Sequence, residues 1–393
     1  MKISAGISRP ARIVFVIYSL GGGGAERTTA NLSSIFADEG CDVSIVTLSP
    51  LEADAYPLHA AVRRLNLGRA GISRTGEELA GLRATMQRLT ALRRALVELD
   101  PDLVIGMMST ANVMTAIASI GLRFAVIGSE RIHPPQFPLS SVWSLARRIS
   151  YRLLDALVVL TTDTAEWAKR HTWTRRIVVI PNQVIWPVPA TAGGQIPDAW
   201  VRPGRMLLLA VGRLEPQKGF DLLLEAFSRI AASQPLWDLA IVGEGSCRGA
   251  LSEQASRLRI ADRVVMPGRA GDIAAWYQRA SLFVLSSRFE GFPNVLVEAM
   301  AYGLPSISFA CPTGPSDVIR DGVNGTLVNP EDIEGLAQAM SLLMSDGGAR
   351  EGLAQDAQLV RSQFAPEEIM PLWKSLVFEL ARNSRFNVDK TWQ

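Results

Sequence analysis

The chain has 393 residues, of which 48% are hydrophobic, with 40 Lys and Arg against 38 Asp and Glu. This length exceeds what one hydrophobic core usually supports, so we expect two α/β domains. No apolar run approaches the roughly 18 residues that span a bilayer, which argues against an integral membrane protein. Three scattered cysteines without paired spacing argue against a disulfide framework and a zinc site, and they fit a reducing cytosol.

Short apolar runs alternate with longer helical stretches along the whole chain. The predicted strands are 13–20, 43–48, 103–107, 125–128, 156–160, 177–180, 206–211, 239–242, 264–266, 282–285, 306–309 and 326–328. Uniformly apolar strands separated by helices predict doubly wound parallel sheets that are covered on both faces.

Prolines and glycines accumulate without a periodic pattern between Pro181 and Gly204, which indicates a linker. We therefore expect a first domain at 1–183, a linker at 184–204, a second domain at 205–365 and a helical tail at 366–393. A nucleotide cleft is expected between the two domains, at the carboxyl ends of both sheets.

Four glycines at 21–24 follow the first strand and precede an amphipathic helix, so the backbone of Gly22 and Gly23 can approach a ligand closely. A dinucleotide fingerprint would need a glycine where Glu26 stands, which argues against NAD binding. The chain has no Gly-x4-Gly-Lys-Ser/Thr segment, so a nucleoside-triphosphate P-loop is absent.

Asp100-Pro-Asp102 has the spacing of an Asp-x-Asp metal site, but the surrounding sequence predicts a proline turn between a helix and a strand. We therefore expect no metal and no cofactor. Glu130, Arg131 and His133 follow the strand at 125–128 and are expected to face the cleft as acceptor-side candidates.

The amino-terminal half is the basic half. Residues 1–190 hold 21 Lys and Arg against 15 Asp and Glu, whereas residues 191–393 hold 19 against 23. This asymmetry indicates contact with an anionic membrane surface or a phosphorylated acceptor, although ordinary solvated helix faces would also explain it. The segment 143–154, with three arginines among apolar residues, is either an interfacial amphipathic helix or a helix packed on a sheet.

Two carboxylates flank a strand-to-helix turn in Glu-Gly-Phe-Pro-Asn-Val-Leu-Val-Glu at 290–298. Gly291 allows close backbone approach, Pro293 suits a first helical turn and Asn294 can cap the helix, so free N–H groups and the helix dipole favour an anion there. Because a phosphate repels carboxylates, Glu290 and Glu298 are expected to accept hydrogen bonds from hydroxyls on either side of it.

The 290–298 segment and its neighbours resemble the signature of retaining glycosyltransferases of family 4. Val-Gly-Arg-Leu-Glu-Pro-Gln-Lys-Gly at 211–219 resembles the first loop of that family's nucleotide domain, the glycines at 21–24 resemble its amino-terminal loop, and 309–315 with 322–325 resemble a later stretch. The resemblance implies the GT-B fold, in which two Rossmann-like domains face a central cleft and the carboxyl-terminal helix crosses back to the first domain.

The resemblance also implies roles for individual residues. Arg213 and Lys218 would grip the diphosphate, Glu290 would contact the donor sugar, and Glu298 would hold the ribose. The remaining donor-binding candidates are Gly22, Gly23, Glu244, Gly268, Arg269, Gly291, Phe292, Pro293, Asn294 and Val295. Many family members carry a His near the sugar where this chain has Glu130 or Arg131, and its His133 comes slightly later.

The resemblance therefore implies a retaining, metal-independent hexosyltransferase in cell-surface polysaccharide synthesis. The expected donor is a UDP-linked nucleotide sugar, and the expected acceptor is a glycan or a lipid-linked saccharide. The expected location is cytoplasmic, with peripheral binding to the inner face of the membrane, and no nucleic-acid partner is expected. Two alternatives stay open: a non-catalytic nucleotide-sugar-binding partner subunit, and an epimerase or phosphorylase with the same fold.

Overall fold

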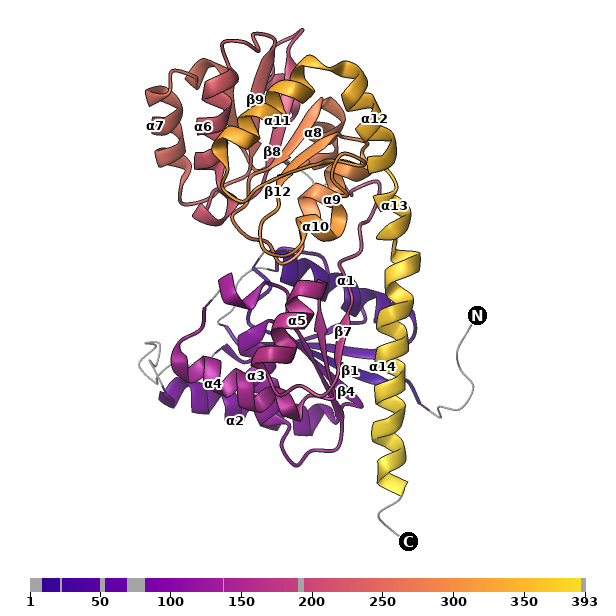
Figure 1. Cartoon of the computed structure of the whole chain (residues 1–393). Helices are drawn as coiled ribbons and strands as arrows, with labels where there is room; N and C mark the ends of the chain where they lie inside the picture. The colour runs from indigo at the N-terminus through magenta and orange to yellow at the C-terminus, as the bar shows by residue number, and fades with distance from the viewer. Residues whose placement is uncertain are drawn as a thin grey trace. The chain divides into compact units, whose positions relative to one another are not determined.

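The computed structural model describes residues 9–21, 23–49, 54–68, 82–136, 138–189 and 194–389. The chain forms two compact units (Figure 1). Unit 1 comprises Met1–Ile180 and Pro371–Gln393, and unit 2 comprises Pro181–Met370. Each unit has its own parallel sheet, and helices cover both sheets.

The sheet of unit 1 has seven parallel strands in the order β3-β2-β1-β4-β5-β6-β7. They are β1 (Arg12–Ile17), β2 (Asp42–Thr47), β3 (Arg63–Asn66), β4 (Leu103–Met107), β5 (Ala125–Ser129), β6 (Ala156–Val159) and β7 (Ile177–Val179). The central strands are buried along their whole length, as expected for a sheet with helices on both faces.

Strand β3 was not among the predicted strands. Its sequence, Arg-Arg-Leu-Asn, is mostly polar, and it lies at the edge of the sheet, where only one neighbouring strand pairs with it. Charged side chains are common on edge strands because they hinder pairing with other chains. A search for apolar runs therefore misses this strand.

The helices of unit 1 are α1 (Gly24–Asp38), α2 (Leu82–Leu99), α3 (Ser109–Ala118), α4 (Ser141–Ser150), α5 (Thr162–His171) and the part of α14 (Pro366–Asp389) that begins at Pro371. Helix α14 packs on this unit through Phe378, whose ring lies edge-on to Phe36 of α1 at 6.2 Å. Glu379 of α14 also forms an ion pair with Arg176, with 2.6 Å between Oε1 and Nη1.

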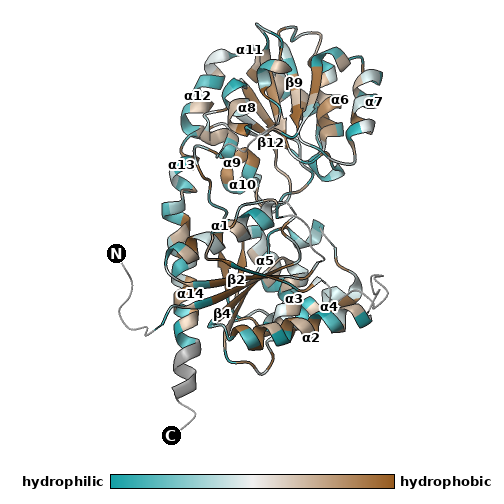
Figure 2. Cartoon of the chain, turned by 180° about the vertical axis from the view of Figure 1, so that it is seen from behind, coloured by the Kyte–Doolittle hydropathy of each residue, from teal (hydrophilic) through white to brown (hydrophobic). Residues whose placement is uncertain are grey.

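The sheet of unit 2 has six parallel strands in the order β10-β9-β8-β11-β12-β13. They are β8 (Met206–Val211), β9 (Trp237–Val242), β10 (Val264–Gly268), β11 (Leu282–Leu285), β12 (Ser306–Phe309) and β13 (Thr326–Val328). Figure 2 shows the hydrophobic character of these strands and the mixed character of the helices around them. The prediction of two parallel α/β sheets is confirmed.

Helices alternate with strands along unit 2 up to β13, and α11, α12 and α13 then follow in succession. The helices are α6 (Phe220–Ile230), α7 (Arg248–Arg257), α8 (Ile273–Arg279), α9 (Asn294–Ala301), α10 (Pro315–Val318), α11 (Ile333–Ser345), α12 (Gly347–Ala357) and α13 (Val360–Gln363). Helix α6 is strongly amphipathic: Leu223, Leu224 and Phe227 are buried in the core, and Glu225 and Arg229 form an ion pair on the other face.

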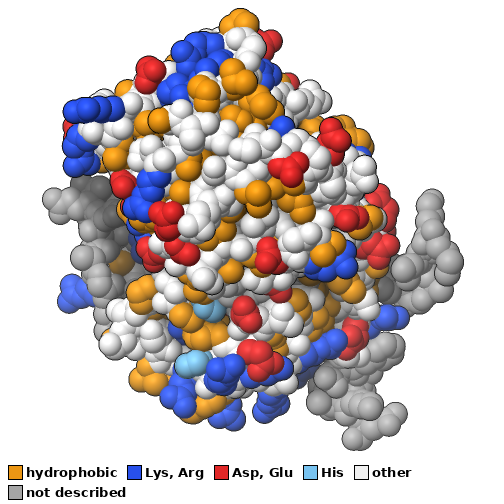
Figure 3. Space-filling model, turned by 45° about the horizontal axis from the view of Figure 1, so that its top comes forward, with side chains coloured by type: hydrophobic (Ala, Val, Ile, Leu, Met, Phe, Trp, Pro, Cys, Tyr) orange, Lys and Arg blue, Asp and Glu red, His pale blue; other side chains and the backbone are white. Residues whose placement is uncertain are grey.

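Charged side chains of both signs are mixed with hydrophobic ones on the face of the molecule drawn in Figure 3. Single exposed apolar residues, such as Leu236 and Leu342, are ordinary features of a protein surface. Within the described part of the chain, no helix combines the length and the hydrophobicity needed to cross a membrane.

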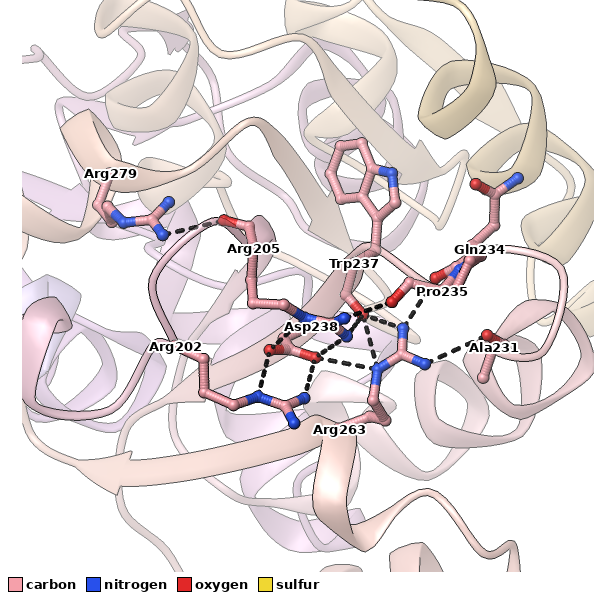
Figure 4. Close-up of polar contacts among 9 residues, drawn as sticks. All are labelled: Arg202, Arg205, Ala231, Gln234, Pro235, Trp237, Asp238, Arg263 and Arg279. Carbon is pink, nitrogen blue, oxygen red and sulfur yellow. Dashed lines mark hydrogen bonds and ion pairs between the residues drawn. The ribbon is translucent and has the colours of Figure 1, made fainter.

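Three arginines surround the buried carboxylate of Asp238 at the amino end of the unit 2 sheet (Figure 4). The Nη2 atoms of Arg205 and Arg202 lie 2.6 and 2.9 Å from its Oδ1, and Arg263 Nε lies 2.9 Å from the same atom. Burial opposes ionisation, but hydrogen bonds from Arg205, Arg202 and Arg263 outweigh it and lower the pKa of Asp238. This cluster joins the first residues of the sheet, at the end opposite to the carboxyl ends of the strands.

Candidate active site

The strand order reverses direction at one place in each sheet, between β1 and β4 in unit 1 and between β8 and β11 in unit 2. In doubly wound sheets the loops diverge at such a point, and ligands bind there, outside the carboxyl ends of the strands. In unit 2 the loops that follow β8 and β11 are the ones that carry the two predicted donor motifs. The topology therefore brings these motifs together.

Lys218 and Glu290 form the centre of this arrangement. Lys218 Nζ lies 2.6 Å from Glu290 Oε1, and their side chains are only 14% and 6% exposed. Ser287 Oγ donates a second hydrogen bond to the same carboxylate oxygen, at 2.6 Å. An ammonium has three N–H donors, so Lys218 can hold Glu290 and an anionic ligand at the same time.

The loop after β8 depends on a glycine. Gly219 has φ +60°, a left-handed conformation, and a Cβ at this position would lie 2.1 Å from the carbonyl oxygen of Ser286. The close approach of these two backbones places the turn at 216–218 beside the end of β11. Two hydrogen bonds extend the contact, from Arg288 N to Gln217 O and from Gln217 Nε2 to Phe289 O.

Arg213, the second predicted diphosphate ligand, is exposed. Its Nη2 lies 3.4 Å from Gln217 Oε1, a long contact that leaves the guanidinium weakly held. Arg213 and Lys218 therefore have different surroundings. Lys218 is mostly shielded from solvent and forms an ion pair, whereas Arg213 is an exposed side chain on the same loop.

The segment at 290–298 forms a strand-to-helix turn, but its cap differs from the prediction. Pro293, whose ring has no hydrogen-bond acceptor, occupies the N-cap of α9, and Asn294 is the first helical residue. The prediction that Asn294 caps this helix is wrong, because its Oδ1 instead accepts a hydrogen bond from Asn182 Nδ2 at 2.9 Å. Phe292 is buried and packs edge-on against Phe364, whereas Val295 is partly exposed.

Glu298 lies one turn into α9 and is 6% exposed. Its Oε2 accepts a hydrogen bond from Tyr277 Oη at 3.0 Å, and the Tyr277 ring stacks on Tyr302 with 5.5 Å between centroids. Tyr302 Oη in turn accepts a hydrogen bond from Val188 N. The Glu298 carboxylate is thus held in place by α8, a contact that the residues at 290–298 do not reveal by themselves.

The segment between β12 and α10 also reaches Glu290. Thr313 Oγ1 donates a hydrogen bond to the carbonyl oxygen of Glu290. Gly314 has φ +97°, and a Cβ there would lie 2.8 Å from the Pro293 ring. Cys311 is buried beside them, and burial, followed by the charge of Glu290, raises the pKa of its thiol to about 12. The glycine at 314 therefore allows the two loops to pack.

Glu244, Gly268 and Arg269 lie at the ends of β9 and β10. Glu244 Oε1 forms an ion pair with Arg248 Nη2 at 2.6 Å, and the hydrogen bond from Arg248 lowers the pKa of Glu244. Gly268 has φ +94°, and its carbonyl oxygen accepts a hydrogen bond from Gly243 N at 2.9 Å. Arg269 is exposed. The hydrogen bond between Gly243 and Gly268 thus joins the ends of β9 and β10, and the Glu244–Arg248 ion pair lies beside them.

In unit 1, Gly23 precedes α1 with φ +155°, while Gly22 lies outside the described residues. Arg131 connects this helix to the segment after β5, because its Nη2 donates to Thr28 Oγ1 at 3.2 Å. Burial lowers the pKa of Arg131 to about 9. His133 is 9% exposed, and burial lowers its pKa as well, although Asp163 acts in the opposite direction.

Glu130 has a different environment from its two neighbours. It is 1% exposed, and both carboxylate oxygens accept hydrogen bonds from Ser109 Oγ, at 2.9 and 2.8 Å. Tyr151 also donates to it, and Asn112 donates to Tyr151. Burial raises the pKa of Glu130, although the hydrogen bonds from Tyr151 and Ser109 act against this. These internal contacts favour a structural role for Glu130 and leave Arg131 and His133 as the acceptor-side candidates.

Two family models match the chain in succession. Residues 23–183 match the glycosyl transferase 4-like domain, and residues 205–346 match the glycosyl transferases group 1. The lipopolysaccharide core biosynthesis glycosyltransferase LpsE of Rhizobium meliloti is 31% identical over 244 residues, which are 61% of this chain and 69% of that protein. The chain belongs to the glycosyltransferase family that these two models describe, with a 4-like amino-terminal domain and a group 1 carboxyl-terminal domain.

A second relative matches this glycosyltransferase along almost its whole length. The GalNAc-alpha-(1->4)-GalNAc-alpha-(1->3)-diNAcBac-PP-undecaprenol alpha-1,4-N-acetyl-D-galactosaminyltransferase of Campylobacter jejuni is 28% identical over 370 residues, with 94% of this chain and 99% of that protein covered. The matches confirm the predicted family, and they support the glycosyltransferase interpretation over the epimerase, phosphorylase and partner-subunit alternatives.

The fold of the glycosyltransferase is also that of solved GT-B structures. The structure of Anabaena HepE in complex with UDP-glucose has a TM-score of 0.72 at 19% identity, with 94% of this chain and 100% of that chain covered. At this identity the likeness shows the fold alone. The predicted GT-B fold is therefore confirmed, while the roles of the individual site residues stay predictions.

Proposed function

We propose that this glycosyltransferase moves a hexosyl group from a UDP-linked sugar to a hydroxyl of a glycan or lipid-linked saccharide, with retention of configuration, in cell-surface polysaccharide synthesis. The observation that carries the proposal is the Lys218–Glu290 ion pair at the strand-order reversal of unit 2. At this place Lys218 can bind a diphosphate, and Glu290, which is hydrogen-bonded to it, can accept hydrogen bonds from sugar hydroxyls.

In the proposed reaction, the bond between the sugar's anomeric carbon and the β-phosphate oxygen breaks, and the acceptor oxygen bonds to the same face of that carbon. The departing phosphate oxygen takes the acceptor's proton, so no protein nucleophile is required. Lys218, Arg213 and the amides after Gly291 would stabilise the negative charge on the departing diphosphate. Glu290 would orient the sugar through its hydroxyls, and Glu298 would hold the ribose.

The acceptor class is proposed from the relatives. The Campylobacter jejuni protein is named for a saccharide linked to undecaprenol through a diphosphate, and the Rhizobium meliloti protein for the lipopolysaccharide core. Both names refer to saccharides on a lipid, and the first also includes a diphosphate. We infer an acceptor of this chemical class for the present chain, together with a peripheral location at the inner face of the cytoplasmic membrane.

A panel of UDP-, GDP- and ADP-sugars, measured by thermal shift and by donor hydrolysis, tests the proposed donor. A ligand that binds only the folded state stabilises it by about 2.7 kcal/mol at 100 times its Kd. We expect UDP and one UDP-hexose to raise the melting temperature and the matching GDP and ADP compounds to leave it unchanged. Stabilisation by GDP- or ADP-sugars alone would overturn the choice of UDP.

We further propose that the reaction needs no metal ion, because Lys218 and Arg213 supply the positive charge. Asp102 of the Asp-x-Asp pattern is 5% exposed and accepts hydrogen bonds from Arg12 N at 2.8 Å and from Arg9. These contacts join β1 and β4 at their amino ends. We expect turnover to be the same in EDTA as without it; loss of turnover that manganese or magnesium restores would contradict this proposal.

A further inference from the structure

Helix α4 exposes apolar side chains on the face that points away from the core. Val142 is 77% exposed, Leu145 57% and Ile149 44%, and Leu153 in the turn after the helix is 44% exposed. Their spacing of three and four residues places them along one side of the helix. The opposite side carries Trp143 and Ala146, which pack on the core of unit 1. The outward stripe therefore contributes nothing to that core.

Basic side chains flank this stripe. Arg148 and Arg152 are exposed, whereas Arg147 is buried with its guanidinium 4.7 Å from the centre of the Trp167 ring. Residues 131–154 contain no Asp or Glu. Trp173 is 49% exposed and lies beside Arg148, whose guanidinium is 5.5 Å from its ring. The exposed surface thus combines aliphatic, aromatic and cationic groups.

The surface is defined here by Val142, Leu145, Arg148, Ile149, Arg152 and Leu153, and is called the α4 surface. We propose that the α4 surface docks on an anionic lipid bilayer, with its aliphatic side chains at the boundary between headgroups and acyl chains and its arginines on the lipid phosphates. Helices that lie in a membrane interface combine an apolar stripe with Lys and Arg in this way, and Trp concentrates at the same depth. A surface helix packed on a sheet normally has a polar outer face instead.

The charges around the α4 surface favour a lipid over a second protein chain. The stretch from 131 to 180 contains eight Lys and Arg, of which Arg131 and Arg147 are buried, but only three acidic residues, Asp155, Asp163 and Glu166. Glu166 is paired with Lys169, and Arg176 is paired with Glu379 of α14. The remaining excess of positive charge complements a leaflet that carries anionic lipids.

The position of α4 connects the inference to the proposed function. The segment that leads into α4 begins at the carboxyl end of β5 and contains Arg131 and His133, the acceptor-side candidates. Docking through α4 would therefore place these residues near the bilayer, where a lipid-linked acceptor lies. The inference rests on the proposed membrane location, which it deepens by naming the surface and adding an apolar contribution to binding.

Cosedimentation with phosphatidylcholine vesicles, with and without phosphatidylglycerol, tests the proposal on the full chain. We expect binding to the anionic vesicles, and Arg148→Gln with Arg152→Gln should weaken it by about 25-fold, because each basic residue near the surface contributes roughly fivefold. Leu145→Ser with Ile149→Ser should weaken it by roughly tenfold or more, and this loss should persist at high salt because it does not depend on charge.

Matched changes elsewhere serve as controls. Arg94→Gln with Arg257→Gln removes two exposed arginines, and Leu342→Ser removes a leucine that is 64% exposed. We expect both variants to bind vesicles like the wild type. Every variant should keep the wild-type rate of donor hydrolysis, which separates a failure of docking from a failure of the proposed catalytic function.

Three results would overturn the proposal. The first is equal vesicle binding by the wild type and both α4 variants, and the second is no binding by the wild type. The third is a change in oligomeric state in the Leu145→Ser and Ile149→Ser variant without vesicles, which would assign the stripe to a second copy of the chain.

Discussion

Replacing Lys218 by methionine should lower turnover by about 10²-fold or more while UDP-sugar binding weakens less. Methionine keeps the aliphatic stem and removes the charge. The negative charge on the diphosphate grows as its bond to the sugar breaks, so a cation fixed beside it stabilises the transition state more than the bound donor. Steady-state kinetics with the donor varied, together with UDP calorimetry, separates the two effects.

The ion pair with Glu290 requires a control, because the single change leaves a glutamate side chain that is 6% exposed without its cation. Removing one partner of a buried ion pair typically costs about 3–5 kcal/mol of stability. The double variant Lys218→Met with Glu290→Gln removes both charges and should recover the lost stability but not the turnover. Recovery of turnover in the double variant would show that Lys218 serves only to neutralise Glu290.

Arg213 provides a second comparison on the same loop. Its exposed side chain makes only a long contact with Gln217, so Arg213→Ala should leave the melting temperature unchanged. A loss of turnover in this variant would therefore come from the reaction itself. Wild-type turnover in both the Arg213 and Lys218 variants would remove the diphosphate assignment altogether.

Most of the fold could be predicted from the sequence because parallel strands that are buried on both faces are uniformly apolar. The strands at 103–107 and 282–285 were found in this way, and their bounds agree with β4 and β11. The uniform apolar pattern is absent where a strand is not buried on both faces. Strand β3 has one pairing neighbour and partly exposed side chains, so it contains the polar residues that are typical of an edge strand.

The site was only partly predictable, because its contacts join residues that are distant in the sequence. Lys218 and Glu290 are 72 positions apart, and only the pairing of β8 with β11 makes them neighbours. Tyr277 and Thr313 lie 21 and 23 positions from the glutamates that they contact, so no local pattern points to them. Ser287 differs, because it precedes Glu290 by three residues in the same loop and was a local signal for a donor to that carboxylate.

The direction of the Glu130 side chain could not be predicted from the sequence. Its place after a strand in the amino-terminal domain predicted a side chain that faces the cleft. The structure instead turns the carboxylate inward, where Ser109 and Tyr151 donate to it. A strand end specifies which edge of the sheet a residue reaches, but the direction of its side chain depends on the donors that the neighbouring helices supply.

Changing Glu298 and Glu290 separately should give different losses. Glu298→Ala should weaken the binding of UDP by about 1.5–3 kcal/mol, because a charged acceptor of a hydrogen bond from the ribose is lost. Glu290→Gln keeps the shape of the side chain and its contact with Ser287, so UDP should bind nearly as tightly as to the wild type. Transfer should nevertheless fall strongly, because the carboxylate that orients the sugar next to Lys218 is gone.

Tyr277→Phe tests whether the position of Glu298 matters as well as its charge. This change removes the hydroxyl that holds Glu298 Oε2 and keeps the ring that stacks on Tyr302. If Glu298 binds the ribose, the affinity for UDP should fall in Tyr277→Phe as well, but by less than in Glu298→Ala. The affinity of Glu290→Gln for UDP should stay near that of the wild type. Calorimetry with UDP resolves losses of this size. Wild-type UDP binding in Glu298→Ala, or weaker UDP binding in Glu290→Gln than in Glu298→Ala, would show that the two carboxylates do not have these roles and that Glu298 mainly anchors α8 to α9.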